Sequence, residues 1–217
     1  MTTALNQFLQ AHNYNKATKD TKPITHTRMP RDGSFGGCWH IPESEQELFL
    51  NLIHQAIFKE GLIEHLTETQ NKDNGPLLID LDFRYDLKDN SRFHTGETID
   101  QLVEAIILVL NQMFAVNADY KIFFLERPHQ YKDEKVVKDG IHIVVGIQTN
   151  KAMRMHFRKL FIAELETKGT LKRLPLINTL EDVVDKAVIS GFSNWQMIGS
   201  RKPNRDPYKL TYFYRKL

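Results

Sequence analysis

An apolar run that carries two carboxylates constrains this chain more than any other feature. The run reads Leu77-Leu78-Ile79-Asp80-Leu81-Asp82-Phe83, a composition typical of a β-strand. Side chains alternate between the two faces of a strand, so Asp80 and Asp82 share one face and their apolar neighbours share the other. Two carboxylates this close repel each other unless a cation lies between them, and Mg²⁺ is usually held by one or two carboxylates together with substrate phosphates. The run therefore predicts a metal site, although an Asp-x-Asp pair taken alone also fits a solvated turn.

A second strand-like segment is typical of a phosphate site. It reads Lys138-Asp139-Gly140-Ile141-His142-Ile143-Val144-Val145, and Lys138, Gly140 and His142 fall on one alternating face. A ligand can approach the backbone closely at Gly140 because glycine has no side chain. A cation, a gap and an imidazole in a row suit a phosphate group, whereas His142 taken alone also fits a half-buried histidine that binds nothing.

The last third of the chain carries a further carboxylate and a further anion site. Asp185 follows the apolar pair Val183-Val184, so it is expected to complete the carboxylate cluster from a separate strand. The segment Trp195-Gln196-Met197-Ile198-Gly199-Ser200-Arg201-Lys202-Pro203 places a glycine and a hydroxyl next to two cations. This combination predicts a second site for anions.

These segments occur in an order that resembles the archaeo-eukaryotic primase superfamily. The order is an apolar strand with Asp-x-Asp, then Lys-x-Gly-x-His, then an apolar pair with Asp, then Gly-Ser-x-Lys-Pro. Two earlier segments are similar to the branch found in primase-helicases of nucleocytoplasmic large DNA viruses. They are Thr25-His26-Thr27-Arg28 and Gly36-Gly37-Cys38-Trp39-His40-Ile41-Pro42. The resemblance runs from about Thr25 to Pro203, which is most of the chain.

The resemblance implies a nucleotidyl-transfer site on an RNA-recognition-motif-like catalytic core, preceded by a smaller αβ unit. It implies that two Mg²⁺ or Mn²⁺ ions, with no zinc, are held by the catalytic carboxylates Asp80, Asp82 and Asp185. It implies that the nucleotide is bound by Lys138, Gly140, His142, Ser200 and Lys202. Two positions depart from the family pattern. Gly140 replaces a serine that relatives often carry, and Gln196 stands near a position where many relatives carry arginine.

The composition is that of an ordinary soluble globular protein. The chain has 217 residues, of which 41% are hydrophobic and 26% charged, enough for one or two small domains. It has no apolar run of transmembrane length, and its N-terminus does not resemble a secretory signal. The single cysteine, Cys38, excludes an internal disulfide and a cysteine-rich zinc site. A cytoplasmic location is expected, in a host cytoplasm or a viral factory within it.

Charge is segregated along the chain although the net charge is only +2. Residues 43–104 hold 5 basic and 14 acidic side chains, residues 127–173 hold 11 and 5, and residues 201–217 hold 6 and 1. Basic segments after a phosphate site predict a path for a single-stranded DNA template, although residues 151–173 also fit a solvated helix face. The expected template contacts are Arg28, Arg201, Arg205, Lys209 and Arg215.

Hydrophobic periodicity predicts a mixed α/β fold. Residues 1–24 are expected to be a polar segment with a short helix near Ala4–Ala11, and residues 25–217 a catalytic domain. Ser44 and Glu47 predict a capping box for a helix over residues 45–59. The remaining predicted helices cover residues 99–114 and 150–167. The predicted strands cover residues 77–83, 120–126, 141–147, 195–198 and 210–214, and a charged segment, 128–139, joins the second to the third.

The predicted function is that of a DNA primase or primase-polymerase. Such an enzyme transfers nucleotides from NTPs or dNTPs to a strand on a DNA template by a two-metal mechanism. The chain has no P-loop of its own, and the resemblance implies a helicase partner in cis or in trans. The chain is therefore expected to be an N-terminal part of a longer primase-helicase.

Two alternatives to this function stay open. One is a metal-dependent nuclease, which needs the carboxylates but not the strand from Lys138 to His142. The other is a non-catalytic module that binds single-stranded nucleic acid by stacking bases on exposed aromatic residues. The candidates for stacking, which also fit core positions, are Phe123, Phe124, Tyr212, Phe213 and Tyr214.

Overall fold

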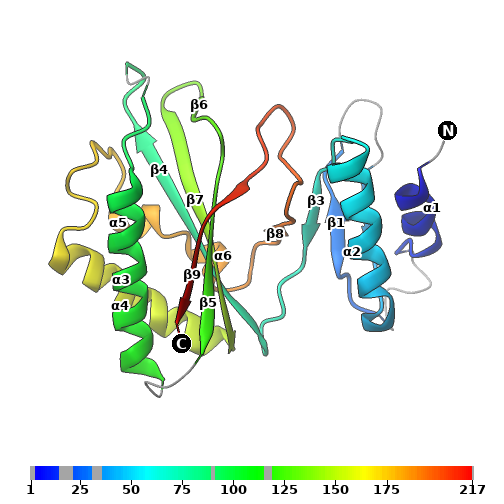
Figure 1. Cartoon of the computed structure of the whole chain (residues 1–217), viewed down its shortest axis with the longest axis horizontal. Helices are drawn as coiled ribbons and strands as arrows, with labels where there is room; N and C mark the ends of the chain where they lie inside the picture. The colour runs from blue at the N-terminus through cyan, green and yellow to red at the C-terminus, as the bar shows by residue number, and fades with distance from the viewer. Residues whose placement is uncertain (1–2, 15–21, 31–35, 89–90, 115–118, 217) are drawn as a thin grey trace. The chain divides into compact units, whose positions relative to one another are not determined.

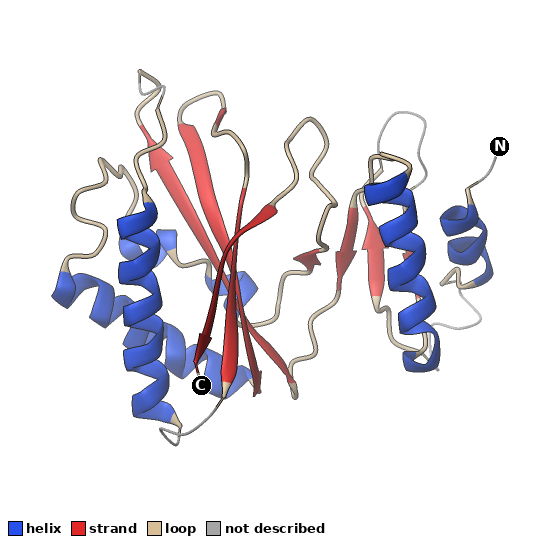
Figure 2. Cartoon of the chain, in the orientation of Figure 1, coloured by secondary structure: helices blue, strands red, loops and turns tan. Residues whose placement is uncertain are grey.

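The computed structural model describes residues 3–14, 22–30, 36–88, 91–114 and 119–216. They form two compact units: unit 1 comprises Met1–Gln70 and Asn194–Tyr208, and unit 2 comprises Asn71–Ser193 and Lys209–Leu217. Each unit has its own antiparallel sheet and its own helices, so the chain is mixed α/β as predicted (Figure 1, Figure 2). The expected division after residue 24 does not coincide with these units, because the first helix packs into the core of unit 1. No helix in the described ranges is long and apolar enough to cross a membrane.

Unit 1 is built on a sheet of four short strands. They are β1 (His26–Arg28), β2 (Gly37–Trp39), β3 (Leu66–Glu68) and β8 (Trp195–Gln196), in the order β2-β1-β3-β8. The helices are α1 (Ala4–Ala11), the 3₁₀ turn η1 (Glu43–Glu45), α2 (Gln46–His54) and the π-helix η2 (Gln55–Lys59). Leu5 and Leu9 of α1, and Phe49 and Ile53 of α2, lie four residues apart on their helices and are buried in one core.

The start of α2 differs from the prediction. Its N-cap is Glu45, with no capping bond from a side chain, so the predicted capping box of Ser44 and Glu47 is wrong. The turn η1 is the physical reason, because the backbone N–H groups of Glu45 and Gln46 already donate to carbonyls within that turn. Donors that a capping side chain would otherwise satisfy are therefore already paired.

Two glycines of unit 1 are required by local geometry. A Cβ atom at Gly37 would lie 2.7 Å from the ring of Trp39, which is buried in the unit 1 core. Gly199 has a φ of +77°, and a Cβ atom there would lie 2.9 Å from Ile57 and from Phe58. Both glycines lie in segments that carry the family resemblance, and in this fold they let the backbone pass close to packed side chains.

Unit 2 has the β-α-β-β-α order of a split β-α-β core. Its strands are β4 (Gly75–Tyr85), β5 (Tyr120–Glu126), β6 (Tyr131–Lys132), β7 (Val137–Thr149) and β9 (Lys209–Lys216). Its helices are α3 (Gly96–Met113), α4 (Lys151–Lys168), α5 (Leu180–Val183) and α6 (Lys186–Ile189). The antiparallel strand order is β4-β7-β5-β9, with β6 paired to β7. Strand β5 has the predicted bounds, whereas β6 and the first residues of β7 replace much of the expected connection over residues 128–139.

One face of the unit 2 sheet packs against α3 and α4 (Figure 1). Alternate residues of β4, including Leu77, Ile79 and Leu81, are fully buried on that face. The intervening residues point to the opposite face, where Asp80 and Asp82 are partly exposed. The sheet thus separates an apolar core from a face that carries the two carboxylates.

The basic segment 127–173 is in part structural. Helix α4 begins at its predicted cap, since the Asn150 side chain accepts a backbone N–H at 3.0 Å. Arg154 and Arg158 of α4 are only 1% and 7% exposed. Arg154 donates three hydrogen bonds to backbone and hydroxyl oxygens. Arg158 donates to a backbone carbonyl and pairs with Glu181 at 2.6 Å. These two cations hold the core of unit 2, so they are not positioned to contact a template.

Candidate active site

The register between β4 and β7 aligns the predicted site residues in three successive cross-strand pairs. The pairs are Asp80 with His142, Asp82 with Gly140, and Arg84 with Lys138. All six residues point away from the helices, because the residues that alternate with them in β4 are buried in the core. We call these six residues the β4–β7 row. The row carries two carboxylates and an imidazole at one end, a gap at Gly140, and two cations at the other end.

Asp80 and His142 contact each other directly. The Nε2 atom of His142 lies 3.5 Å from Oδ1 of Asp80, and the two side chains are 9% and 16% exposed. The imidazole is therefore at the carboxylate end of the row, within reach of a group bound beside Asp80. Its predicted contact with a nucleotide triphosphate stays a prediction.

Asp185 is attached to the outer edge of β4 through its backbone. Its N–H donates to the carbonyl of Asp80 at 3.0 Å, and Val184 before it forms an antiparallel bridge with Leu81. The predicted separate strand is therefore a single bridge, because α6 begins directly after Asp185. The Asp185 side chain is the N-cap of α6, where Oδ1 accepts two backbone N–H groups at 2.6 and 3.2 Å. The fold brings this residue beside Asp80, and a cation shared by their carboxylates stays a prediction.

Asn178 holds the same edge of β4 further along. Its Nδ2 donates to the carbonyl of Asp82 at 2.9 Å, and its Oδ1 accepts the N–H of Arg84 at 3.1 Å. An amide side chain thereby takes the place of a neighbouring strand, so these backbone groups are paired although β4 is an edge strand. Asn178 was not predicted from the sequence, because no local pattern identifies a contact between segments so far apart in the chain.

The donor set of the row suits a hard divalent cation. Carboxylate oxygens are favoured ligands of Mg²⁺ and Mn²⁺, and Asp80 and Asp82 lie on one partly exposed strand face. Among the described residues, no group of three or more His, Cys, Asp or Glu side chains is arranged as a metal site. Mg²⁺ often takes one or two carboxylates from the protein and further oxygens from phosphate. The two carboxylates fit such an ion, and the cluster of three carboxylates stays a prediction.

A buried ion network supports β7 from the opposite face of the sheet. The Asp139 carboxylate accepts two hydrogen bonds of 2.9 Å from Arg92 and one of 2.9 Å from the N–H of Gly140. His94 lies 3.5 Å from Asp139 and 2.6 Å from Glu126. The hydrogen bond from His94 lowers the pKa of Glu126, against the effect of burial, which raises it. The network holds the backbone N–H of Gly140. It was not predicted from the sequence, although Asp139 lies inside the second segment, because its partners Arg92, His94 and Glu126 are distant along the chain.

In the predicted anion site of unit 1, Ser200 is buried and makes hydrogen bonds within the unit. This residue is 0% exposed, and its hydroxyl accepts the N–H of Leu66 at 3.2 Å. Its carbonyl accepts a hydrogen bond from the Gln196 amide. Lys202 is exposed, in a turn where its carbonyl accepts the N–H of Arg205 at 3.1 Å. Burial of Ser200 does not favour a contact with nucleotide, whereas the predicted phosphate contact of Lys202 stays a prediction.

Arg28 is buried rather than presented to solvent. It is 8% exposed, and its guanidinium lies 2.9 and 3.0 Å from the two carboxylate oxygens of Glu64 and 2.9 Å from Oδ1 of Asn6. Burial raises the pKa of Glu64, and the adjacent Arg28 opposes this rise. A template contact would require Arg28 to leave these partners. The burial and pairing of Arg28 therefore do not favour the predicted template contact, which stays a prediction.

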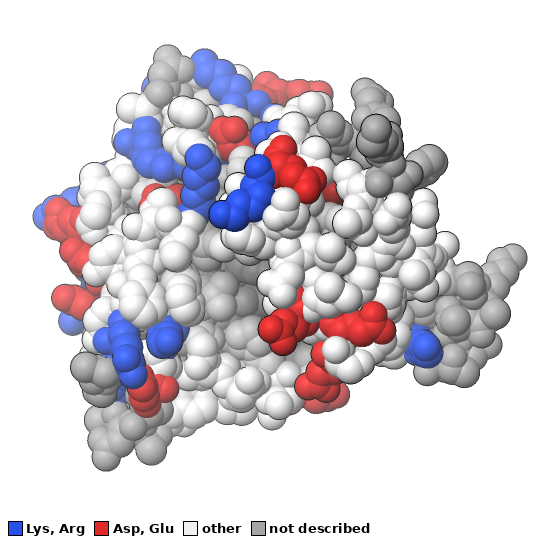
Figure 3. Space-filling view, turned by 45° about the vertical axis from the view of Figure 1, so that its right-hand side comes forward, with Lys and Arg blue, Asp and Glu red and all other residues white. Residues whose placement is uncertain are grey.

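The remaining predicted template contacts are at least partly exposed. Lys209 begins β9, and Arg215 near the end of β9 pairs with Asp119 at 3.1 Å. Arg201 and Arg205 are partly exposed in unit 1. Figure 3 shows that the Lys and Arg side chains of the described residues lie in several separate groups on the face in view, with Asp and Glu beside them. The template path stays a prediction that depends on individual exposed cations.

The aromatic residues of β5 and β9 divide between the core and the surface. Phe124 is 0% exposed, whereas Tyr212 and Phe213 are 37% and 48% exposed. Phe123 contacts Phe213 with ring centroids 5.2 Å apart, and the register places Phe123 on the same sheet face as the β4–β7 row. The core interpretation thus holds for Phe124, whereas the partly buried Phe123 and the exposed Phe213 contact each other on the sheet face that carries the β4–β7 row.

Comparisons with known proteins agree with the order of these segments. The family model for the "C962R protein N-terminal AEP domain", where AEP denotes archaeo-eukaryotic primase, matches residues 25–214. "Putative helicase L207/L206" of Acanthamoeba polyphaga mimivirus is 30% identical over 195 residues, which cover 88% of this chain and 20% of that protein. "Putative helicase 184R" of Invertebrate iridescent virus 6 is 23% identical over 222 residues, which cover 86% of this chain and 21% of that protein. The chain thus spans about a fifth of the length of these two relatives. Because the family model matches most of its length, the chain belongs to the archaeo-eukaryotic primase family.

Proposed function

We propose that this domain is a template-directed nucleotidyltransferase that acts as a DNA primase or primase-polymerase. The observation that carries the proposal is the β4–β7 row, in which Asp80 and Asp82 lie across from His142 and Gly140, with Lys138 next along the strand. Membership in the archaeo-eukaryotic primase family supports the same reaction class.

In the proposed reaction, a 3′-hydroxyl oxygen forms a bond to the α-phosphorus of an incoming NTP or dNTP. The bond from that phosphorus to the bridging oxygen breaks, pyrophosphate leaves, and the hydroxyl proton is lost to solvent. Asp80, Asp82 and Asp185 would hold two Mg²⁺ or Mn²⁺ ions. Such ions, when bound, favour ionisation of the attacking hydroxyl and offset the charge of the departing pyrophosphate. The protein otherwise contributes position and charge, which dominate catalysis of phosphoryl transfer.

The triphosphate would be held by Lys138 and His142 of the β4–β7 row, and the predicted phosphate contact of Lys202 stays a separate prediction. Charge-assisted hydrogen bonds to phosphate are among the stronger polar contacts in proteins. The missing side chain at Gly140 lets a phosphate approach the strand closely between the carboxylates and Lys138. Since Ser200 is buried, its part would be to shape the turn that presents Lys202.

The partners follow from the chemistry and from the relatives. Two relatives carry the word helicase in their names and are more than four times as long as this chain. We infer that a helicase acts with this domain, in the same polypeptide or as a separate partner. We also infer that the template is single-stranded DNA bound by the exposed cations.

The test of the reaction is incubation with a single-stranded DNA template, Mg²⁺ or Mn²⁺ and labelled nucleotides, with products sized on a denaturing gel. We expect Asp82→Asn to lower synthesis about a hundredfold or more, the usual scale for losing one preorganised charge contact. Asp86→Asn is the matched control, because Asp86 is exposed and follows directly after β4. Synthesis by Asp82→Asn at the wild-type rate would contradict the assignment. Degradation of the template would instead indicate the nuclease, and binding without either product would indicate the single-strand binding module.

A second measurement tests the role of His142. We expect His142→Ala to weaken nucleotide binding about ten- to a hundredfold in the presence of metal, because a hydrogen-bond partner of the charged phosphates is removed. Template affinity should stay close to the wild-type value. An unchanged nucleotide affinity would exclude the triphosphate contact.

A further inference from the structure

Arg84 is a cation of the β4–β7 row that the sequence analysis did not single out. The register places it opposite Lys138 and two residues after Asp82 on the same face. Its N–H donates to Asn178 at 3.1 Å, and its carbonyl accepts the N–H of Ile177 at 2.9 Å. Its guanidinium, in contrast, makes no hydrogen bond or ion pair within the part of the chain that the structure describes. The backbone of Arg84 is thus held in place while its side chain is available to a ligand.

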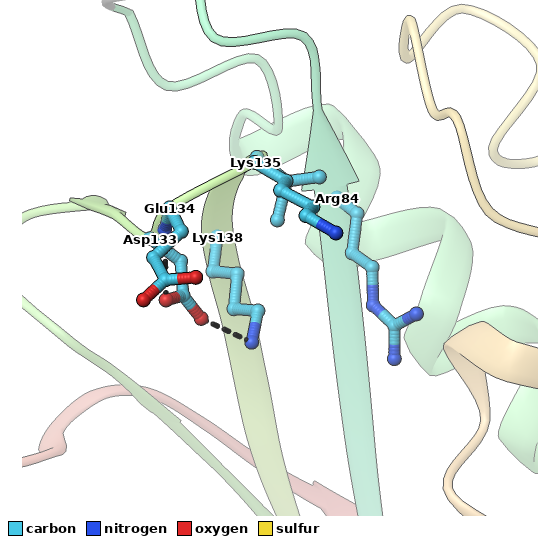
Figure 4. A pocket seen from close by; sticks show the side chains of 6 residues that line it. Arg84, Asp133, Glu134, Lys135 and Lys138 are labelled. Carbon is cyan, nitrogen blue, oxygen red and sulfur yellow. Dashed lines mark hydrogen bonds and ion pairs between the residues drawn. The ribbon is translucent and has the colours of Figure 1, made fainter.

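Arg84 and Lys138 line an open pocket of about 430 Å³ at the end of the row (Figure 4). The rest of the lining comes from the turn between β6 and β7, namely Asp133, Glu134, Lys135 and Val136. Figure 4 shows the Lys135 side chain directed toward Arg84. The pocket therefore gathers three cations beside the predicted phosphate site, against two carboxylates.

Asp133 holds Lys138 in this structure. The Nζ atom of Lys138 lies 2.6 Å from Oδ2 of Asp133, and the two side chains are 33% and 38% exposed. The other carboxylate oxygen of Asp133 accepts the N–H of Glu134 at 2.9 Å, and the Asp133 N–H donates to the Val136 carbonyl at 2.9 Å. A partly exposed ion pair of this kind contributes little free energy. A phosphate group that contacts Lys138 and Arg84 together can therefore displace the Asp133 carboxylate from Lys138.

We propose that Arg84 and Lys138 bind the terminal phosphate of the nucleotide. In the absence of nucleotide Asp133 forms an ion pair with Lys138, and the terminal phosphate displaces Asp133 from Lys138 on binding. This inference rests on the proposed function. The terminal phosphate is favoured because Arg84 lies about 7 Å along the strand from Asp82, at two residues of extended chain. The carboxylates and the ions that they would hold are expected to lie beside the reacting α-phosphate. Arg84 and Lys138, further along the row, are therefore expected to lie beside the terminal phosphate. Arginine suits this place because its planar guanidinium can contact two oxygens of one phosphate.

The test is metal-dependent binding of NTP and of the matching NMP, measured by calorimetry with Mg²⁺ or Mn²⁺. We expect Arg84→Gln to weaken NTP binding about ten- to a hundredfold and to leave NMP binding nearly unchanged. Arg84→Lys keeps the charge without the planar geometry and should recover part of the affinity. Asp133→Asn should tighten NTP binding about two- to fivefold, because the competing carboxylate charge is removed.

Arg173→Gln is the matched control, because Arg173 is an exposed arginine of unit 2 that pairs with Glu97 on the surface at 3.1 Å. Its NTP affinity should equal that of the wild type. If the wild type prefers NTP to NMP and Arg84→Gln keeps that preference, the role of Arg84 is overturned while the proposed function stands. If the wild type binds no nucleotide with either metal, the proposed function fails and this inference fails with it. If Arg84→Gln does not fold, the Asp133→Asn variant decides, since an unchanged NTP affinity there contradicts the displacement.

Discussion

His26 is expected to make the stability of unit 1 depend strongly on pH. It is 2% exposed on β1, its ring lies edge-on to Phe49 with centroids 4.7 Å apart, and Nδ1 lies 3.0 Å from Oγ1 of Thr25. Burial lowers the pKa of His26 from 6.5 to about 4, because the charged imidazolium is poorly solvated there. The folded unit therefore keeps the imidazole neutral under conditions in which the unfolded chain binds a proton.

The sign and size of the effect follow from these two pKa values. Above pH 6.5 the imidazole is neutral in both states, so the full stability is present. As the pH falls from 6.5 to 4, the unfolded state gains a proton that the folded state resists, and the free energy of unfolding drops. A gap of about 2.5 between the pKa values corresponds to about 3 kcal/mol at pH 4. Burial raises the pKa values of Glu64 and Glu68, and these groups act in the opposite direction, since their protonated forms are favoured on folding.

The assay compares the wild type with His26→Gln, so that the glutamates contribute equally to both proteins. Urea unfolding is followed by tryptophan fluorescence at pH 7.5 and at pH 4, because both tryptophans, Trp39 and Trp195, belong to unit 1. Between these two pH values the wild type should lose about 3 kcal/mol more stability than His26→Gln does. An excess loss below about 1 kcal/mol would refute the reasoning, since it would mean that burial of His26 does not keep the ring neutral.

Asp139→Ala removes the buried carboxylate that accepts two hydrogen bonds from the Arg92 guanidinium, and it should lower the stability of unit 2 by about 3–5 kcal/mol in urea unfolding followed by far-UV circular dichroism. The exposed control Asp86→Ala should show almost no loss, and a similar loss in both variants would contradict the role of the network. Gly37→Ala places a methyl group 2.7 Å from the Trp39 ring and should destabilise unit 1 by about 1–3 kcal/mol by tryptophan fluorescence; an unchanged urea midpoint would show that the strand can shift. Charge reversal to Glu of three cations that are at least partly exposed should weaken single-stranded DNA binding for all sequences, measured by fluorescence anisotropy. It should also reduce the salt slope of binding by roughly 0.7 for each phosphate that the protein no longer neutralises. The three cations are Arg205, Lys209 and Arg215, and an unchanged slope would place the template path elsewhere.

The sequence by itself determined the elements whose signals are local. The short helix α1 and the strand β5 have the predicted bounds, and α4 begins at its predicted Asn150 cap. Such signals act within a few residues, because helical and strand periodicity decide which face of an element can be buried. The same alternation put Asp80 and Asp82 on one face of β4, and their segment order led to the correct family.

Only the tertiary structure decided which of these residues meet and which are buried. The register of β4 with β7 placed Arg84 opposite Lys138, and no pattern within either segment determines that register. From the sequence, Arg28 was predicted to contact the template and Ser200 the nucleotide, yet both are buried in unit 1. Asp139 depends on Arg92, which is 47 positions away in the sequence. The physical reason is common to all three: burial, charge pairing and strand register depend on segments distant along the chain, and these are set only when the core packs as a whole.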